Sequence, residues 1–144
     1  MILYTDGASR GNPGLSGIGF ALYNSTDIVL DGCYFLGIKT NNFAEAVAIL
    51  VALYIIKKNN ITRSLIIKSD SLLLINQFKG IYKIKNESLK LAHILFKKHF
   101  ADFTISFLHI EREYNKYADL LANRGIDERI FLSEELLSFL SVLL

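Results

Sequence analysis

Four acidic residues stand where folding could bring their carboxylates to one place: Asp6, Glu45, Asp70 and Asp119. In an open α/β sheet, ligands bind where neighbouring strands expose their carboxyl ends. Asp6 and Asp70 each follow an apolar run typical of a strand, and the crossover rules allow these two strands to be parallel neighbours. Glu45 and Asp119 lie in the first turns of predicted helices, which can open onto the same end of the sheet.

Carboxylates that converge without cations repel one another and raise one another's pKa. A divalent metal relieves this repulsion, and a set of oxygen ligands favours Mg²⁺ or Mn²⁺ over zinc. Two such ions on a phosphodiester, one activating water and the other stabilising the leaving oxygen, make a phosphoryl-transfer nuclease. The pattern therefore predicts two-metal nuclease chemistry.

Each carboxylate also has a purely structural interpretation. Asp6 could open a turn, and Glu45 could complete a capping box with Asn42 as the N-cap. Asp70 could cap the helix that follows its strand. Asp119 could complement the dipole of its own helix. Only the joint placement of all four favours a site.

Hydrophobic patterning predicts ten elements that would position these residues. Short connections make the first three strands an antiparallel meander, and the later strands return through helical crossovers. The fold class is therefore α/β, with a mixed sheet and helices on both faces. A loop is expected over Ala8–Ser16, and Arg124–Gly125 is expected to close the penultimate helix. The strands are Ile2–Tyr4, Gly17–Tyr23, Val29–Ile38, Ser64–Ser69 and Phe103–Ile110; the helices are Phe43–Lys58, Ser71–Lys79, Glu87–Phe100, Asn115–Asn123 and Ser133–Leu144.

Composition limits the class of protein. The 144 residues are 51% hydrophobic, which indicates one folded domain, and their net charge of +2 is compatible with a nucleic acid partner without arguing for one. Cys33 is the only cysteine, so an intramolecular disulfide is excluded. The longest apolar run, Ala46–Ile56, is too short for a membrane span. No signal peptide is recognisable, so the expected location is the cytoplasm.

Four short motifs, each with one of the carboxylates, resemble type 1 ribonuclease H from Met1 to about Gly125. They are Tyr4–Ala8 with Gly11–Gly14, Thr40–Asn42 with Ala44–Glu45, Ser69–Ser71, and Asn115 with Ala118–Asp119 and Leu121–Asn123. The resemblance implies a five-stranded ribonuclease H-like sheet, of three antiparallel and two parallel strands.

The resemblance also implies an activity: endonucleolytic hydrolysis of the RNA strand of RNA–DNA hybrids, leaving 3′-hydroxyl and 5′-phosphate ends. Asp6 and Asp70 would bridge two Mg²⁺ or Mn²⁺ ions, while Glu45 would bind one ion and Asp119 the other. Alternatives are a nuclease of the same fold that also cuts double-stranded RNA, and a hybrid-binding module without catalysis.

The same resemblance implies substrate contacts. The amides of Asn12, Asn41 and Asn42 would meet the minor groove of the hybrid, although Asn41 and Asn42 could instead cap their helix. Thr40 and Asn86 resemble a phosphate pocket for the DNA strand.

Two departures from the family pattern concern substrate binding and catalysis. The long basic, tryptophan-rich insertion of many members is reduced to Gly80–Asn86, where Tyr82 and Lys83 either bind the hybrid or form a solvated connector. The flexible histidine loop is also missing. Arg112 is the candidate for its place, with His109 as the weaker alternative.

The tail lies outside the resemblance. Residues 1–127 are expected to form the ribonuclease H domain, and residues 128–144 a helical tail with a leucine stripe. Docking of this stripe on the same domain is favoured over a dimer contact, so a monomer is expected.

Overall fold

The computed structural model describes all residues, Met1–Leu144, and has one mixed sheet at its centre. The strand order is β3-β2-β1-β4-β5, with the first three antiparallel and β4 and β5 parallel to β1. This confirms the predicted fold class. The strands are β1 Ile2–Gly11, β2 Gly14–Asn24, β3 Asp27–Lys39, β4 Ser64–Ser69 and β5 Thr104–His109.

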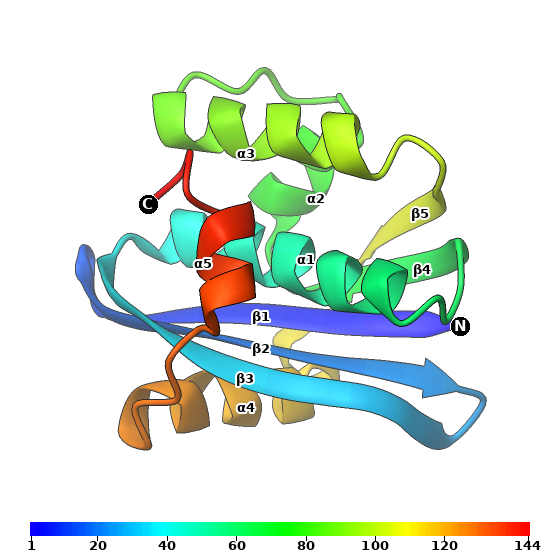
Figure 1. Ribbon diagram of the computed structural model, residues 1–144, viewed down its shortest axis with the longest axis horizontal. Coiled ribbons are helices and arrows are strands. Elements are labelled where there is room, and N and C mark those ends of the chain that lie inside the picture. Colours follow the sequence, from blue (N-terminus) through cyan, green and yellow to red (C-terminus); the bar gives the residue numbers. More distant parts are fainter.

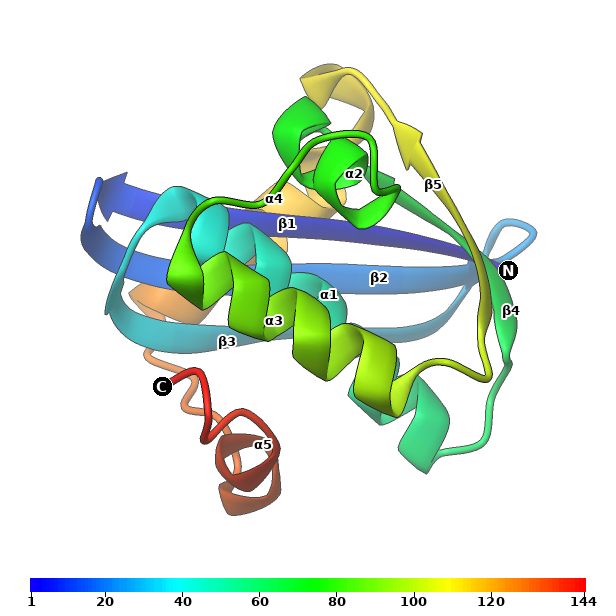
Figure 2. The same cartoon turned by 90° about the horizontal axis from the view of Figure 1, so that it is seen from above.

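Helices cover both faces of the sheet (Figure 1). One helix, α4, lies beneath β1–β3, whereas α1, α2, α3 and α5 lie on the opposite side. Figure 2 shows α3 crossing above α1. None of these helices combines the length and the apolar character needed to cross a bilayer. The helices are α1 Asn41–Lys58, α2 Leu72–Phe78, α3 Glu87–His99, α4 Lys116–Asp127 and α5 Glu134–Phe139, with a 3-10 turn, η1, at Arg112–Tyr114.

The core lies mainly between the sheet and α1. Twelve of the residues of α1 are buried, from Phe43 to Ile56, because the sheet packs below the helix and α3 packs above it. A helix apolar nearly all round needs such cover on both sides. The first turn of α1 therefore has a fixed position over β1.

The predicted loop Ala8–Ser16 is wrong, because β1 and β2 continue through it as one hairpin. Pairing runs as far as Gly11 opposite Gly14. The hydroxyls of Ser9 and Ser16 donate to the carbonyl of Lys39 at 3.0 and 2.9 Å, which ties the hairpin to the end of β3. Small polar residues whose composition is typical of a loop thus form their hydrogen bonds within a sheet.

Two predicted helix boundaries are also wrong. The N-cap of α1 is Thr40, whose hydroxyl accepts the Phe43 N–H at 3.2 Å, so Asn42 lies inside the first turn and forms no capping box with Glu45. Gly125 does not end α4, which continues to Asp127. A Cβ on Gly125 would lie 2.6 Å from the carbonyl oxygen of Tyr34, so this glycine permits close packing of α4 on β3.

The final helix is shorter than predicted and packs on α1. Leu132, Leu136 and Leu140 are buried in the main core, and the ring of Phe139 lies 4.6 Å from that of Tyr54. The division between residues 1–127 and 128–144 stays a prediction, although the contacts of the tail are with the same sheet-and-helix body.

Candidate active site

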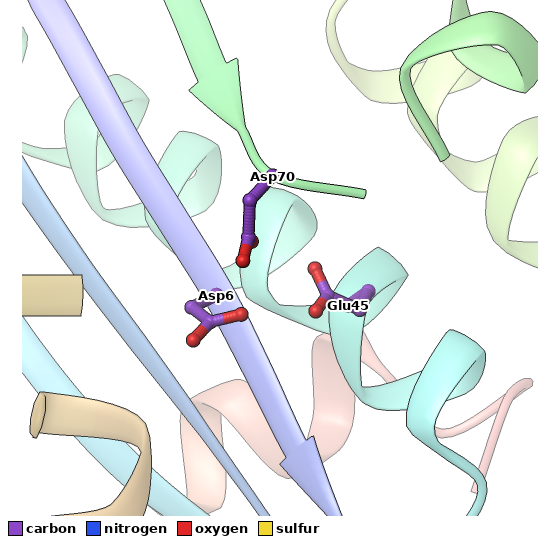
Figure 3. Close-up of side chains that lie close together, drawn as sticks. All are labelled: Asp6, Glu45 and Asp70. Atoms are coloured by element: carbon purple, nitrogen blue, oxygen red, sulfur yellow. The ribbon is translucent and has the colours of Figure 1, made fainter. Parts of the chain in front are cut away.

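Three carboxylates converge beside the edge of β1 (Figure 3). Asp6 comes from β1, Glu45 from the start of α1, and Asp70 from the residue after β4. One oxygen of each lies within 4.8 Å of the others. Three segments far apart in the sequence therefore present acidic oxygens to one point.

The parallel pairing of β1 with β4 explains how Asp6 and Asp70 meet. This pairing covers only Ile2–Tyr4 opposite Ile66–Lys68. The sequence predicted Asp6 at the end of its strand, but β1 continues to Gly11. Asp6 instead lies just beyond the end of the pairing between β1 and β4. The edge of β1 is unpaired there, and Asp70 follows the last residue of β4 at the same level.

Glu45 reaches the site because Gly7 lets α1 approach β1 closely. A Cβ at Gly7 would lie 2.3 Å from the backbone nitrogen of Glu45 and 2.5 Å from the carbonyl carbon of Ala44. Only glycine has room there. The glycine next to Asp6 therefore fixes the distance between the strand and helix that carry two of the carboxylates.

Asp119 lines the same cleft but lies outside the group of three. It stands in the first turn of α4, and the cleft has a volume of about 390 Å³. Asn123, one turn later, donates its amide N–H to the Asp119 carbonyl at 3.0 Å and to the carboxylate at 3.3 Å. Asp119 is thus held at the rim of the cleft by its own helix.

Arg10 extends this hydrogen-bond chain. Its guanidinium donates to Oδ1 of Asn123 at 3.3 Å and pairs with Asp127 at 2.6 Å. Because Oδ1 of Asn123 accepts from Arg10, its NH₂ group faces Asp119. Neither Arg10 nor Asn123 was predicted as a site residue. Asn123 appears in the sequence only as part of the motif Leu121–Asn123, and its spacing of four from Asp119 places both on one helix face.

Asn115 plays the corresponding role for Asp70. It is only 1% exposed, and its Nδ2 donates to the Thr5 carbonyl at 3.0 Å and to Oδ1 of Asp70 at 3.2 Å. In the sequence Asn115 is recognisable only as part of a motif and not as a site residue, because its two partners lie on β1 and beyond β4.

Burial and mutual repulsion favour protonation of the carboxylates. Burial, with smaller contributions from the charges of Asp70 and Asp119, raises the pKa of Asp6 to about 7. Burial, followed by the charge of Asp6, raises the pKa of Glu45 well above its usual range. Such shifts mark carboxylates whose charge is not compensated by protein groups.

The donor set fits a divalent metal ion. Oε2 of Glu45 is buried without a hydrogen-bond partner, although it belongs to a carboxylate that can accept several hydrogen bonds. Hard cations such as Mg²⁺ and Mn²⁺ prefer oxygen ligands of this kind. Asp6, Glu45 and Asp70 are the residues that could hold such an ion, with Asp119 nearby.

Several other predicted residues lie in or beside the cleft. Arg112 and Asn41 line it together with the carboxylates, whereas His109, the last residue of β5, does not. The side chain of Asn12 accepts the backbone N–H of Asn41 at 3.1 Å, which places the hairpin tip beside the start of α1.

Four further predicted substrate residues do not line the cleft. Thr40 and Asn86 are N-caps, of α1 and α3, and Asn86 accepts the Leu89 N–H at 3.1 Å. Tyr82 lines a separate groove of about 320 Å³ at the α2–α3 connection, and Lys83 is exposed beside it.

Comparison with known proteins agrees with this geometry. Residues 4–125 match the family described as Reverse transcriptase-like. A ribonuclease H of Clostridium botulinum is 34% identical over 151 residues, covering 89% of this chain and 96% of that protein. The chain spans only 35% of the length of three mycobacterial relatives, to which it is 29% identical.

Solved structures give the same result. The crystal structure of RNase H1 from the halophilic archaeon Halobacterium salinarum has a TM-score of 0.83 at 32% identity, covering 88% of this chain and 97% of that chain. LC11-RNase H1 in complex with an RNA/DNA hybrid has a TM-score of 0.81 at 32% identity, and the match covers 88% of this chain and 96% of that chain.

The sheet order and the carboxylate cleft at its centre define a ribonuclease H-like protein. The matches cover most of this chain and nearly all of several relatives. The chain therefore belongs to the type 1 ribonuclease H family, which confirms the resemblance found in the sequence.

Proposed function

We propose that this protein hydrolyses the RNA strand of RNA–DNA hybrids, with Mg²⁺ or Mn²⁺ in its cleft. The observation that carries the proposal is the convergence of Asp6, Glu45 and Asp70 within 4.8 Å. Membership of the ribonuclease H family and the hybrid bound to LC11-RNase H1 support hybrid as the substrate. The products would be 3′-hydroxyl and 5′-phosphate ends.

In this mechanism the carboxylates are ligands for two ions. Asp6, Glu45 and Asp70 would hold these ions together with Asp119. The bound ions would supply an activated water molecule and would neutralise charge on the leaving oxygen. Asn115 keeps the Asp70 carboxylate facing the cleft, and Asn123 does the same for Asp119.

The cations and amides around the cleft would hold the substrate. Arg112 lines the cleft and would meet the negative phosphodiester near the cleaved bond. Asn12, Asn41 and Asn42 would contact the minor groove, where 2′-hydroxyls distinguish RNA from DNA. Thr40 and Asn86 would bind the DNA backbone, and Tyr82 and Lys83 would extend this contact across α3.

The test is cleavage of a labelled RNA–DNA hybrid with Mg²⁺ or Mn²⁺, beside single-stranded RNA, double-stranded RNA and duplex DNA. We expect hybrid cleavage that Asp70→Asn nearly abolishes, because the variant loses a ligand charge at the centre of the cluster. Asp27→Asn, which changes an exposed aspartate at the start of β3, is the matched control and should retain full activity.

Each other outcome changes the proposal in a defined way. Full activity of a folded Asp70→Asn variant would contradict the metal-ligand role of Asp70. Binding of hybrid without cleavage by either ion would favour a hybrid-binding module. Additional cleavage of double-stranded RNA would keep the mechanism and broaden the substrate.

A further inference from the structure

A second cavity, of about 400 Å³, lies between β1, β2 and the start of α4 and is lined by four tyrosines. Tyr4 comes from β1, Tyr23 from β2, Tyr114 from η1 and Tyr117 from α4. The protein has only 7 tyrosines and no tryptophan, so most of its tyrosines lie around this one cavity. The nuclease mechanism above uses none of them.

Contacts between side chains hold the tyrosine rings in place. Tyr4 and Tyr23 pack edge to face with centroids 5.4 Å apart. The hydroxyl of Tyr117 donates to the carboxylate of Asp31. Tyr114 is 68% exposed, so one wall of the cavity presents an aromatic ring to solvent. Binding a planar ligand would therefore require little reordering of the other rings.

The lining selects a flat, uncharged ring with polar edges. Ala21 and Ala118 contribute small apolar surface, Ser25 and Thr26 contribute hydroxyls, and no charged side chain lines the cavity. Its volume is within the range of small-molecule sites. The ammonium of Lys68 lies 5.5 Å from the centre of the Tyr4 ring, so a cation stands beside the cavity. A nucleobase with its adjoining phosphate matches this combination.

The cavity lies next to the carboxylate cleft, and two of its lining residues are tied to the carboxylates. Asn115 lines the cavity and also donates to Asp70. Tyr4 precedes Asp6 by two positions on β1, so both side chains lie on the same face of the strand. A nucleic acid strand whose phosphodiester lies in the cleft has neighbouring nucleotides within reach of the tyrosines.

We propose that this cavity binds an unpaired base of the RNA strand that flanks the hybrid. A base inside a duplex has both faces covered by its neighbours, whereas an unpaired base can stack on tyrosine. This inference rests on the proposed function, because it takes RNA as the strand held in the cleft. It assigns the protein a preference for hybrids next to single-stranded RNA.

The direct test uses 2-aminopurine, a fluorescent base that is quenched when it stacks. It is placed in a short unpaired RNA overhang at either end of a hybrid, and Asp70→Asn protein keeps the substrate intact. We expect quenching on binding. Tyr114→Ala should remove the quenching and weaken overhang binding about fivefold or more. Phe131→Ala is the matched control, because Phe131 is 70% exposed, and it should change neither quantity.

A kinetic test uses the unmodified protein. A hybrid with an overhang should have a lower KM than a blunt hybrid and the same kcat. Tyr114→Ala should raise the KM of the overhang substrate to that of the blunt hybrid, without changing cleavage of the blunt hybrid. Normal binding and cleavage of blunt hybrid, with no quenching at either overhang, would overturn the tyrosine site and leave the proposed function standing.

Failure of the proposed function can be recognised separately. If the protein neither binds nor cleaves any hybrid, single-stranded RNA carrying 2-aminopurine still tests the cavity. Quenching that Tyr114→Ala removes would support the base site, and no quenching would overturn it.

Discussion

Among single residues, Asp6 combines deep burial with a charge that no protein cation compensates. Only 5% of the residue is exposed, and its carboxylate lies beside those of Glu45 and Asp70. Bound metal would compensate these charges and stabilise the folded state by mass action. Without metal, protonation is the only way to relieve the repulsion.

The metal-free protein should therefore lose stability as the pH rises from about 4 to 7. Burial raises the pKa of Asp6 from 3.8 to about 7 in the folded state. Within this window the folded protein keeps a proton that the unfolded chain has released, so the free energy of unfolding falls with increasing pH. Asp6→Asn should reduce this slope, measured by chemical denaturation in EDTA.

Asp27→Asn serves as the control for this measurement, because Asp27 is exposed and should leave the slope unchanged. An equal slope in Asp6→Asn and the unmodified protein would show that Asp6 ionises normally. Added Mn²⁺ at pH 8 should raise the melting temperature of the unmodified protein and have less effect on Asp6→Asn.

Among the elements, the contact between β1 and α1 determines the geometry of the site. Gly7 lies against the backbone of Ala44 and Glu45, which cannot move aside as a flexible side chain could. α1 is also held from above by α3 and buried along its length, so the whole helix would have to shift to admit a methyl group.

Gly7→Ala should lower the free energy of unfolding by about 1–3 kcal/mol, the usual effect of adding a methyl group to a tightly packed protein core. It should also lower hybrid cleavage at temperatures where the variant is folded, because Glu45 moves away from Asp6. Thermal unfolding and cleavage rates measure the two effects.

Gly37→Ala is a suitable control for Gly7→Ala. Gly37 has a φ of +80° and nothing within 4 Å of its Cβ position, so alanine there strains the backbone without displacing the site. It should lower stability but not cleavage by the folded protein. An equal loss of cleavage in both variants would contradict a specific role for Gly7.

For the whole molecule, the tail contributes to the same core as the catalytic elements. Leu132, Leu136 and Leu140 are buried, and Glu135 pairs with Lys58 while accepting a hydrogen bond from Tyr54. The leucine stripe is thus covered by α1 and its neighbours. This removes the main reason to expect a dimer through the tail.

Leu140→Ala should lower the free energy of unfolding by about 2–5 kcal/mol, because the residue is 0% exposed and a cavity would remain. Leu137→Ala is the matched control, since Leu137 is 44% exposed and should have little effect. Truncation after Asp127 should be more destabilising than Leu140→Ala. An unchanged melting temperature in the truncated chain would contradict docking of the tail.

The sequence by itself determined the order of the elements and the four acidic residues. Hydrophobic periodicity depends on neighbours along the chain, so β4, α1 and the helix at Asp119 could be predicted from local patterns. Each carboxylate also belongs to a short motif that can be identified without knowledge of its partners.

Tertiary structure alone decided how those residues meet. Asp6 is a site residue because parallel pairing with β4 stops before it, and Glu45 is close because Gly7 admits α1. Asn115 and the tyrosine cavity likewise depend on contacts between distant segments. Strand pairing, helix packing and hydrogen bonds of this kind leave little local signal, since each needs a partner that the fold supplies.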